Sequence, residues 1–110
     1  MDIDEFQRTF SGIRAFGWDN AKRDRVLRER GIDFEDLRFV FDSPIIAFRS
    51  DRGGEERYVV YGFLDGQELV VVCTFRDDLC WIITARRARR DERKKYHDRV
   101  PRRATSTEQD

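Results

Sequence analysis

Residues 57–87 decide the fold, and they read RYVVYGFLDGQELVVVCTFRDDLCWIITARR. Three apolar runs typical of β-strands lie in this stretch: residues 57–64, 67–76 and 79–85. Asp65-Gly66 separates the first two runs, and this dipeptide is typical of a two-residue hairpin because both turn positions need positive φ. Asp77-Asp78 separates the second and third runs and is a weaker turn signal. The stretch predicts an antiparallel sheet. Apolar residues occupy both the odd-numbered and the even-numbered positions of these runs, so we expect both faces to be covered over the middle of the sheet.

The two turns also predict how the strands pair. If each hairpin closes on the residues that flank its turn, Arg57 and Arg76 share one face at one end of the sheet. Arg86 then lies toward the other end. In the same register Ala85 joins the face of Arg57 and Arg76, whereas Thr84 lies on the opposite face.

Two helices are predicted before the sheet. Asp19 can cap the first helix through its carboxylate, and Gly31 fits the left-handed residue that follows the last helical residue, Arg30. Asp33 can cap the second helix, which Asp42-Ser43-Pro44 ends because proline disfavours helical geometry in the residue before it. The apolar stripe of the second helix consists of Phe34, Leu37, Val40 and Phe41.

Short strands are expected at Ile13–Phe16 and Ile45–Phe48, and a basic helix at Arg90–Arg99 before Val100-Pro101. The predicted fold class is therefore α+β, with two N-terminal helices, an antiparallel sheet of about four strands and a C-terminal basic helix.

A chain of 110 residues is expected to form one domain with a single core. We expect a flexible leader over residues 1–13, a folded domain over 14–99 and a disordered tail over 100–110. The acidic start lacks the features of a signal peptide and no apolar run is long enough for a membrane span, which predicts a cytoplasmic protein with no membrane partner. In that compartment Cys73 and Cys80 are expected to be buried free thiols.

The net charge of zero hides an asymmetry. Residues 86–103 carry ten basic and three acidic side chains, whereas residues 1–85 carry twelve basic and seventeen acidic ones. A basic block of this kind can attract a phosphate backbone or an acidic protein partner, and it is also compatible with a solvated helix face.

Several motifs, taken in order, resemble the BrnT family of type II toxins. Those that carry the resemblance are Phe16-Gly17-Trp18-Asp19-Asn20-Ala21-Lys22, Arg30-Gly31-Ile32-Asp33-Phe34, Val40-Phe41-Asp42-Ser43-Pro44, Glu55-Glu56-Arg57, Tyr61-Gly62, Leu69-Val70-Val71-Val72, Thr74-Phe75-Arg76, Ile82-Ile83-Thr84-Ala85-Arg86-Arg87-Ala88, Glu92-Arg93 and Tyr96. The chain departs from the family at Glu29-Arg30-Gly31, where Lys-His-Gly is usual so that Arg30 replaces a histidine, and at Phe75, where a glutamate is frequent. Thr84 replaces a serine.

The resemblance implies a RelE-like fold and a ribonuclease toxin that inhibits translation by cleaving RNA. It also implies a cognate BrnA-like antitoxin with a ribbon-helix-helix module, through which alone the complex contacts its promoter DNA.

RNA cleavage without a metal requires a base for the 2′-hydroxyl, a stabilised phosphorane and a protonated leaving group. Arginine forks suit the phosphorane, and Glu56 is the candidate base. The sequence shows no cofactor or metal motif, and His97, the only histidine, is expected to be a solvated surface residue. The candidate catalytic residues are Arg57, Arg76, Arg86 and Glu56, and the candidate RNA-binding residues are Lys22, Arg87, Arg90 and Tyr96.

These assignments describe a metal-independent endoribonuclease. The alternative is a non-catalytic module that binds RNA, DNA or protein, which the missing histidine and glutamate favour. Tyr96 can stack on a base or pack its helix against the sheet.

Overall fold

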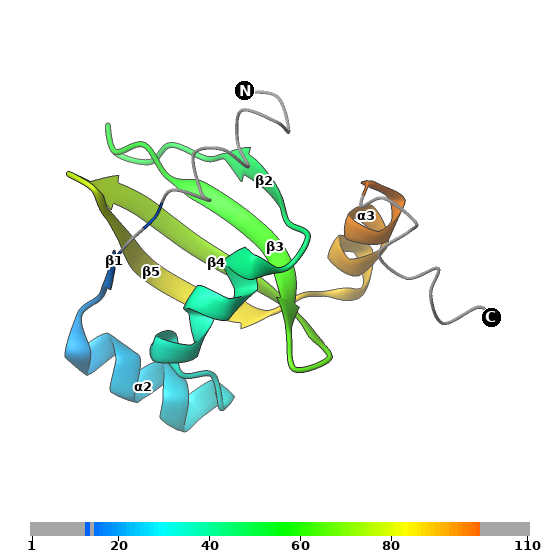
Figure 1. Ribbon diagram of the computed structural model, residues 1–110, viewed down its shortest axis with the longest axis horizontal. Helices are drawn as coiled ribbons and strands as arrows, with labels where there is room; N and C mark the ends of the chain where they lie inside the picture. Colours follow the sequence, from blue (N-terminus) through cyan, green and yellow to red (C-terminus); the bar gives the residue numbers. More distant parts are fainter. Residues whose placement is uncertain (1–12, 14, 100–110) are drawn as a thin grey trace.

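The computed structural model describes residue 13 and residues 15–99 (Figure 1). The elements in chain order are β1 (Ala15–Gly17), α2 (Asn20–Arg30), the 3₁₀ helix η1 (Phe34–Asp42), β2 (Ile46–Arg49), β3 (Tyr58–Leu64), β4 (Gln67–Arg76), β5 (Leu79–Arg87) and α3 (Arg90–Arg99). The predicted α+β class is confirmed. The predicted flexible leader and disordered tail lie outside the described residues, apart from residue 13.

The described strands form one five-stranded mixed sheet in the order β1-β5-β4-β3-β2. This corrects the prediction of an antiparallel sheet of about four strands. The difference is β1, which pairs in parallel with β5 through Ala15–Leu79, Phe16–Cys80 and Gly17–Trp81. Gly17 has a steric reason to be glycine, because a Cβ there would lie 2.7 Å from the Leu79 side chain and 2.9 Å from the Trp81 ring.

The Asp65-Gly66 hairpin has the predicted geometry. Both turn residues have positive φ, 50° at Asp65 and 78° at Gly66, and Leu64 pairs with Gln67. The second hairpin also closes as predicted, with Arg76 opposite Leu79. The positions of the two turns therefore predict this part of the strand register correctly.

A β-bulge changes the register farther along β5. Cys73 pairs with Ile82, but the next residue of β4, Val72, pairs with Thr84, so Ile83 has no partner on β4. The predicted faces of the residues that follow are wrong for this reason, since one extra residue turns the remaining side chains to the opposite face. Ala85 is fully buried in the core, and Thr84 lies beside Val72 on the other face.

The two N-terminal helices form where predicted, but the second is a 3₁₀ helix. The Asp19 carboxylate accepts a bond from the Ala21 N–H at 2.8 Å, and Gly31 ends α2 with φ 71°. In η1 the buried residues are Phe34, Leu37 and Val40, three apart. That spacing matches the three-residue turn of a 3₁₀ helix, in which side chains at i and i+3 eclipse each other.

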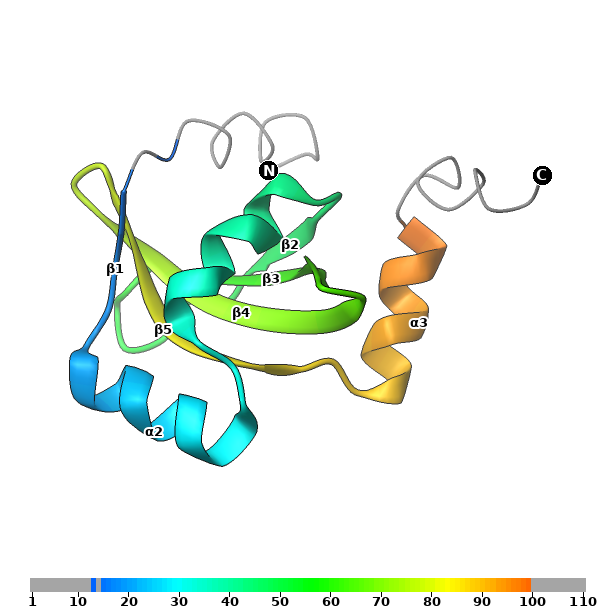
Figure 2. The ribbon, with the colours of Figure 1, turned by 60° about the horizontal axis from the view of Figure 1, so that its bottom comes forward.

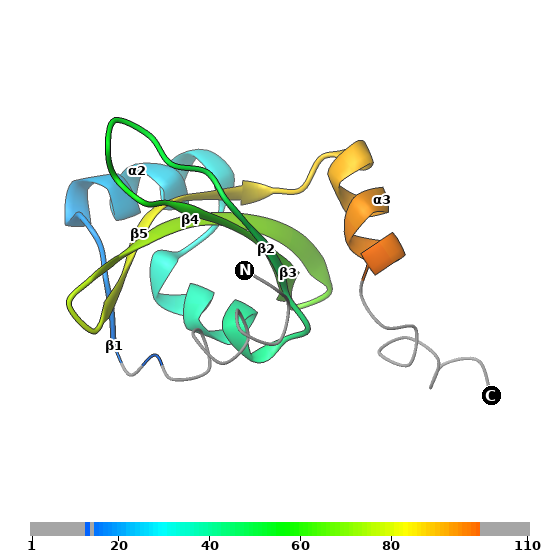
Figure 3. The ribbon, with the colours of Figure 1, turned by 90° about the horizontal axis from the view of Figure 1, so that it is seen from above.

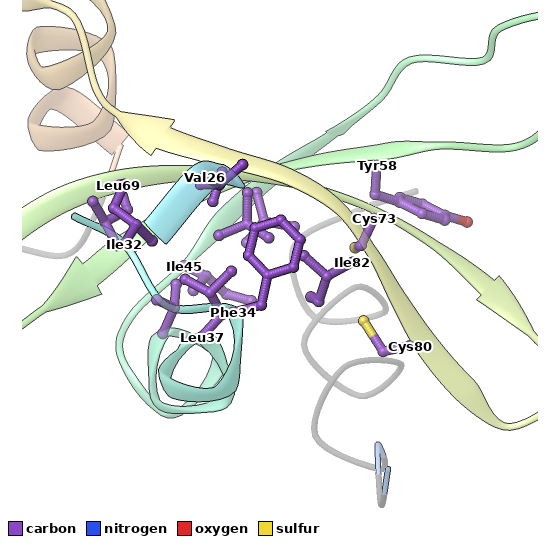
Figure 4. Close-up of a cluster of buried hydrophobic side chains, with 14 residues drawn as sticks. Val26, Ile32, Phe34, Leu37, Ile45, Tyr58, Leu69, Cys73, Cys80 and Ile82 are labelled. Atoms are coloured by element: carbon purple, nitrogen blue, oxygen red, sulfur yellow. The ribbon is translucent and has the colours of Figure 1, made fainter. Parts of the chain in front are cut away.

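The core lies between η1 and the sheet. We call the sheet face that η1 covers the inner face and the opposite one the outer face. Figure 4 shows core side chains from α2, η1 and the strands meeting there, including Val26, Phe34, Leu37, Leu69 and Ile82. A Cβ on Gly62 would lie 2.6 Å from Val40, so β3 and η1 approach closely at this point.

Cys73 and Cys80 are free and buried in the same core, as predicted. A hydrogen bond between the two thiols and their burial raise the pKa of Cys73 well above its ordinary value.

The remaining helices lie at different margins of the sheet. α2 lies beside β5 (Figure 3). Its last residue, Arg30, donates 2.8 Å and 3.3 Å hydrogen bonds to the Ala85 carbonyl and the Thr84 hydroxyl. α3 stands at the far end of the sheet, away from α2 and η1 (Figure 2). Much of the outer face is only half-buried, including Val59, Val72 and Trp81, so the prediction that both faces are covered over the middle of the sheet holds in full for the inner face alone.

Candidate functional site

The bulge in β5 places one predicted site arginine, Arg86, on the outer face. Arg86 pairs with Val70 of β4, which shares this face with Thr74 and Arg76. Without the bulge Arg86 would stand opposite Leu69 and face the core. Arg76 and Val70 are six residues apart on β4, which corresponds to roughly 20 Å. The outer face therefore carries arginines at both ends, with half-buried strand residues between them.

The first group lies beside the β4–β5 turn. We call Glu55, Glu56, Arg57, Arg76 and Trp81 the turn-end cluster. Arg57 Nε lies 2.9 Å from Glu55 Oε1 and Arg76 Nη2 lies 3.6 Å from Glu55 Oε2, so one carboxylate joins both guanidinium groups. Arg76 also lies 4.5 Å over the Trp81 ring. The predicted proximity of Arg57 and Arg76 is confirmed.

Electrostatics at this end favour an ionised carboxylate. The hydrogen bond from Arg57 lowers the pKa of Glu55, and the charge of Arg76 lowers it further. The Arg76 side chain remains 53% exposed, which leaves its guanidinium accessible to an anion in solution. A phosphate oxygen would compete with Glu55 for two arginines that are already oriented toward one point.

Glu56, the predicted base, lies on the rim of this cluster. Its backbone carbonyl accepts a 2.7 Å hydrogen bond from the Thr74 hydroxyl, which fixes the backbone next to Arg57. Its carboxylate lies 3.3 Å from Arg49 and is 62% exposed. A hollow of about 340 Å³ is lined by Glu55, Glu56, Tyr58, Thr74 and Phe75. The geometry supplies Glu56 with an arginine partner but with no feature that distinguishes it as a proton acceptor.

Arg86 is held by Glu92 at the other end of the outer face. Two hydrogen bonds of 2.7 Å and 2.8 Å join the guanidinium to the Glu92 carboxylate, which is 13% exposed. Glu92 also accepts the Arg89 N–H at 2.8 Å, the contact by which a residue in the first turn caps its own helix. The Arg86 hydrogen bond lowers the pKa of Glu92 to about 2. This pair therefore ties the start of α3 to β5.

Tyr96 adds a second attachment of α3. Its hydroxyl donates a 2.5 Å hydrogen bond to the Pro44 carbonyl, and its ring lies 6.3 Å from that of Phe63. Burial raises the pKa of Tyr96 to about 12. Of the two roles considered for Tyr96, packing of the helix is the one that the structure shows, since only 5% of the residue is exposed.

The other predicted RNA-binding residues are dispersed. Arg87 and Arg90 are exposed beside the start of α3, close to Arg86 in the chain. Lys22 is partly buried in the first turn of α2, and no contact found among the described residues joins it to either arginine group.

Sequence reasoning missed the carboxylates that organise these arginines. Glu55 has a weak signal, because it lies two residues before Arg57 in the sequence. Glu92 follows Arg86 by six residues across a strand-to-helix junction, a separation with no regular period. The structure also brings Glu68 of β4 against Arg93 and His97 of α3. That contact depends on where α3 docks, which no local pattern indicates.

Two further properties concern the described residues as a group. No cluster of three or more His, Cys, Asp or Glu side chains in residues 13 and 15–99 is placed to hold a metal ion. None of the helices in this part of the chain is long and apolar enough to cross a membrane.

The comparison with protein families identifies the class. Residues 18–92 match the family described as "Ribonuclease toxin, BrnT, of type II toxin-antitoxin system". The match runs from the residue before the α2 cap to Glu92 and includes the turn-end cluster and the Arg86–Glu92 pair, so the class is a ribonuclease toxin. The chain belongs to the BrnT family. No curated protein and no solved structure matches it significantly.

Proposed function

We propose that this BrnT-family protein cleaves RNA that lies along the outer face of its sheet, and that cleavage inhibits translation. The observation that carries the proposal is that one carboxylate, Glu55, orients Arg57 and the exposed Arg76 toward one point on that face. The two ends of this face are roughly 20 Å apart, a span that several phosphates of an extended RNA chain would cover. Arginines suit this task because they stay charged and bind phosphate oxygens as a fork.

In this proposal the arginines have two roles: most bind phosphates, and one holds α3 in place. Arg57 and Arg76 bind the backbone at the turn end by displacing Glu55, and the exposed Arg87 and Arg90 bind it near α3. Lys22 adds a charge beyond the β5 edge. Arg86 is a positioning residue, since its guanidinium is occupied by Glu92 and holds α3 in place. Stabilisation of the phosphorane by arginine charge requires no metal ion, so we propose metal-independent cleavage.

The partner follows from the class of the protein. We propose a cognate BrnA-like antitoxin that neutralises the toxin and that alone supplies contacts to promoter DNA through a ribbon-helix-helix module. The order of elements, with two helices before the main strands of the sheet and a basic helix after it, supports the RelE-like character of the fold.

Growth and RNA integrity test the proposal. Expression of the full chain in a bacterium that lacks the antitoxin should arrest growth, and the purified chain should cut RNA in the presence of a chelator. Arg57→Ala and Arg76→Ala should each reduce cleavage, whereas Arg28→Ala, an exposed arginine of α2, serves as the matched control. Salt-sensitive RNA binding without any cleavage would instead support the non-catalytic binding module.

A further inference from the structure

A carboxylate of the sheet holds two side chains of α3. Glu68 of β4 has a side chain that is only 10% exposed, and its Oε1 contacts Nε2 of His97. Its other oxygen, Oε2, lies 3.6 Å from Nε of Arg93. The Glu68 backbone carbonyl also accepts the Ala88 N–H at 2.9 Å, which fixes the strand next to the start of α3. One buried acidic group thus orients an imidazole and a guanidinium on the outer face.

The contact determines which nitrogen of the imidazole can accept a proton. Because Nε2 donates to Glu68, the neutral ring carries its lone pair on Nδ1. A carboxylate in this position fixes the tautomer and the orientation of the ring. The His97 side chain is 52% exposed, so a substrate can approach the ring. The ring of Tyr96 packs against it at 5.7 Å.

A hollow beside this pair has the chemistry of a phosphate site. Its volume is about 380 Å³, and Glu68 and Arg93 are among its lining residues together with Arg87. The Arg87 side chain is exposed, and it approaches from the end of β5 whereas Arg93 approaches from α3. Two guanidinium groups from different elements can bind the oxygens of one phosphodiester while the Glu68 carboxylate faces the imidazole.

We propose that the RNA phosphodiester reacts beside this hollow, with His97, which contacts the lining residue Glu68, as the proton acceptor, Glu68 as its positioning residue, and Arg87 and Arg93 as phosphate ligands. Nδ1 of His97 takes the proton of a 2′-hydroxyl, and the 2′-oxygen forms a bond to phosphorus. The bond from phosphorus to the 5′-oxygen breaks, and the departing oxygen takes a proton from water. The products are a 2′,3′-cyclic phosphate and a 5′-hydroxyl, so protons and electrons balance.

This inference rests on the proposed ribonuclease function and assigns the turn-end cluster a different share of the work. Arg57 and Arg76 bind a different phosphate of the chain, roughly 26 Å away along β4 from Glu68, so their loss should raise KM more than it lowers kcat. Loss of His97 should lower kcat. The histidine lies beyond Glu92, where the family match ends, so the inference concerns a residue of this chain that the family match does not cover.

The test separates catalysis from the docking of α3. In His97→Gln the amide nitrogen can still donate to Glu68, so α3 stays attached, but the group that accepts a proton is gone. We expect the untagged full chain with His97→Gln to keep the unfolding midpoint of the wild type and to lose about 10²- to 10⁴-fold in kcat. Lys94→Gln, an exposed change on α3, is the matched control and should cut RNA normally.

The pH profile gives a readout that a structural role would not move. Wild-type cleavage should depend on pH through the proton-accepting imidazole, and the residual activity of His97→Gln should lack this dependence. The charged groups that face the ring are Glu68 from β4 and Arg93 on α3 itself. Glu68→Gln should lower kcat with little change in KM.

Nuclear magnetic resonance examines the site without turnover, because the chain has a single histidine. The ¹⁵N shifts of the neutral ring should show the proton on Nε2, and uridine 3′-monophosphate should shift the His97 signals in the wild type and much less in an Arg87→Ala variant. Unchanged kcat in His97→Gln, or no response of the imidazole to the nucleotide, overturns the inference alone. A wild-type chain that cuts no RNA overturns the proposed function together with it.

Discussion

Replacing Glu92 with glutamine should detach the start of α3 from β5. The substitution keeps the size of the side chain and an oxygen for the Arg89 N–H, but it removes the charge that binds Arg86 through two hydrogen bonds of 2.7 Å and 2.8 Å. The variant leaves a partly buried guanidinium without its carboxylate, and such a loss is costly because the remaining charge has been removed from water.

The magnitude follows from the pKa of Glu92, which the Arg86 hydrogen bond lowers from 4.5 to about 2. At about 1.36 kcal/mol per pKa unit, this shift corresponds to roughly 3 kcal/mol of interaction between the charged carboxylate and the fold. Glutamine retains a neutral hydrogen bond that offsets about 1 kcal/mol of that loss. We therefore expect Glu92→Gln to lower the free energy of unfolding by about 2 kcal/mol at pH 7.

The pH dependence has a definite sign. A carboxylate whose pKa is lower in the folded state stabilises the fold above its unfolded pKa, and this contribution is lost as the pH falls through the folded value. The difference between wild type and Glu92→Gln should thus be complete above pH 4.5 and should shrink toward pH 2. Urea unfolding followed by circular dichroism at several pH values measures it.

Asp91→Asn is the matched control, since Asp91 is the exposed acidic neighbour in the same helical turn. Its unfolding free energy should differ from that of the wild type by less than about 0.5 kcal/mol. If Glu92→Gln is equally benign at pH 7, or if its effect does not depend on pH, the Arg86–Glu92 pair does not hold α3 and the reasoning fails.

Three further predictions concern the core and its margins. Gly62→Ala places a methyl group 2.6 Å from a side chain of η1 and should cost about 1 to 3 kcal/mol in urea unfolding; an unchanged midpoint would show that the helix can move aside. Tyr96→Phe removes the 2.5 Å hydrogen bond to Pro44 and should cost about 1 kcal/mol, which a thermal melt of both proteins would measure. Cys73 and Cys80 should resist a maleimide reagent in native buffer, because both thiols are buried and because burial and the hydrogen bond with Cys80 raise the pKa of Cys73, and both should react once urea unfolds the chain; rapid labelling of the native protein would contradict this.

The sequence predicted those parts of the fold that depend on neighbouring residues. The Asp65-Gly66 turn, the Asp19 cap and the glycine that ends α2 are each decided by a few side chains and their own backbone. The parallel pairing of β1 does not depend on neighbouring residues. Its three residues pair with β5, which is distant in the chain, so no local pattern indicates this pairing. The bulge escaped prediction since Ile82, Ile83, Thr84 and Ala85 suit either face.

In the candidate site, too, the sequence predicted local features and missed those that depend on distant parts of the chain. The proximity of Arg57 and Arg76 followed from hairpin register, which is local. The role of Arg86 depended on the bulge and on Glu92 across a junction. The contact between Glu68 and His97 required the position of α3 over the end of the sheet, which depends on Tyr96 and Phe63 rather than on any motif in the helix.

The extra residue in β5 determines where a residue can be deleted from this strand without turning the later side chains to the opposite face. Deleting Ile83 alone would leave every later residue on its present face, because Thr84 already pairs with Val72 and Ile82 with Cys73. Deleting Thr84 instead would exchange the faces of the residues between that point and the strand end, sending Arg86 toward the core and Ala85 to the outer face. Insertions and deletions in natural variants of this strand are therefore expected at Ile83, or in pairs.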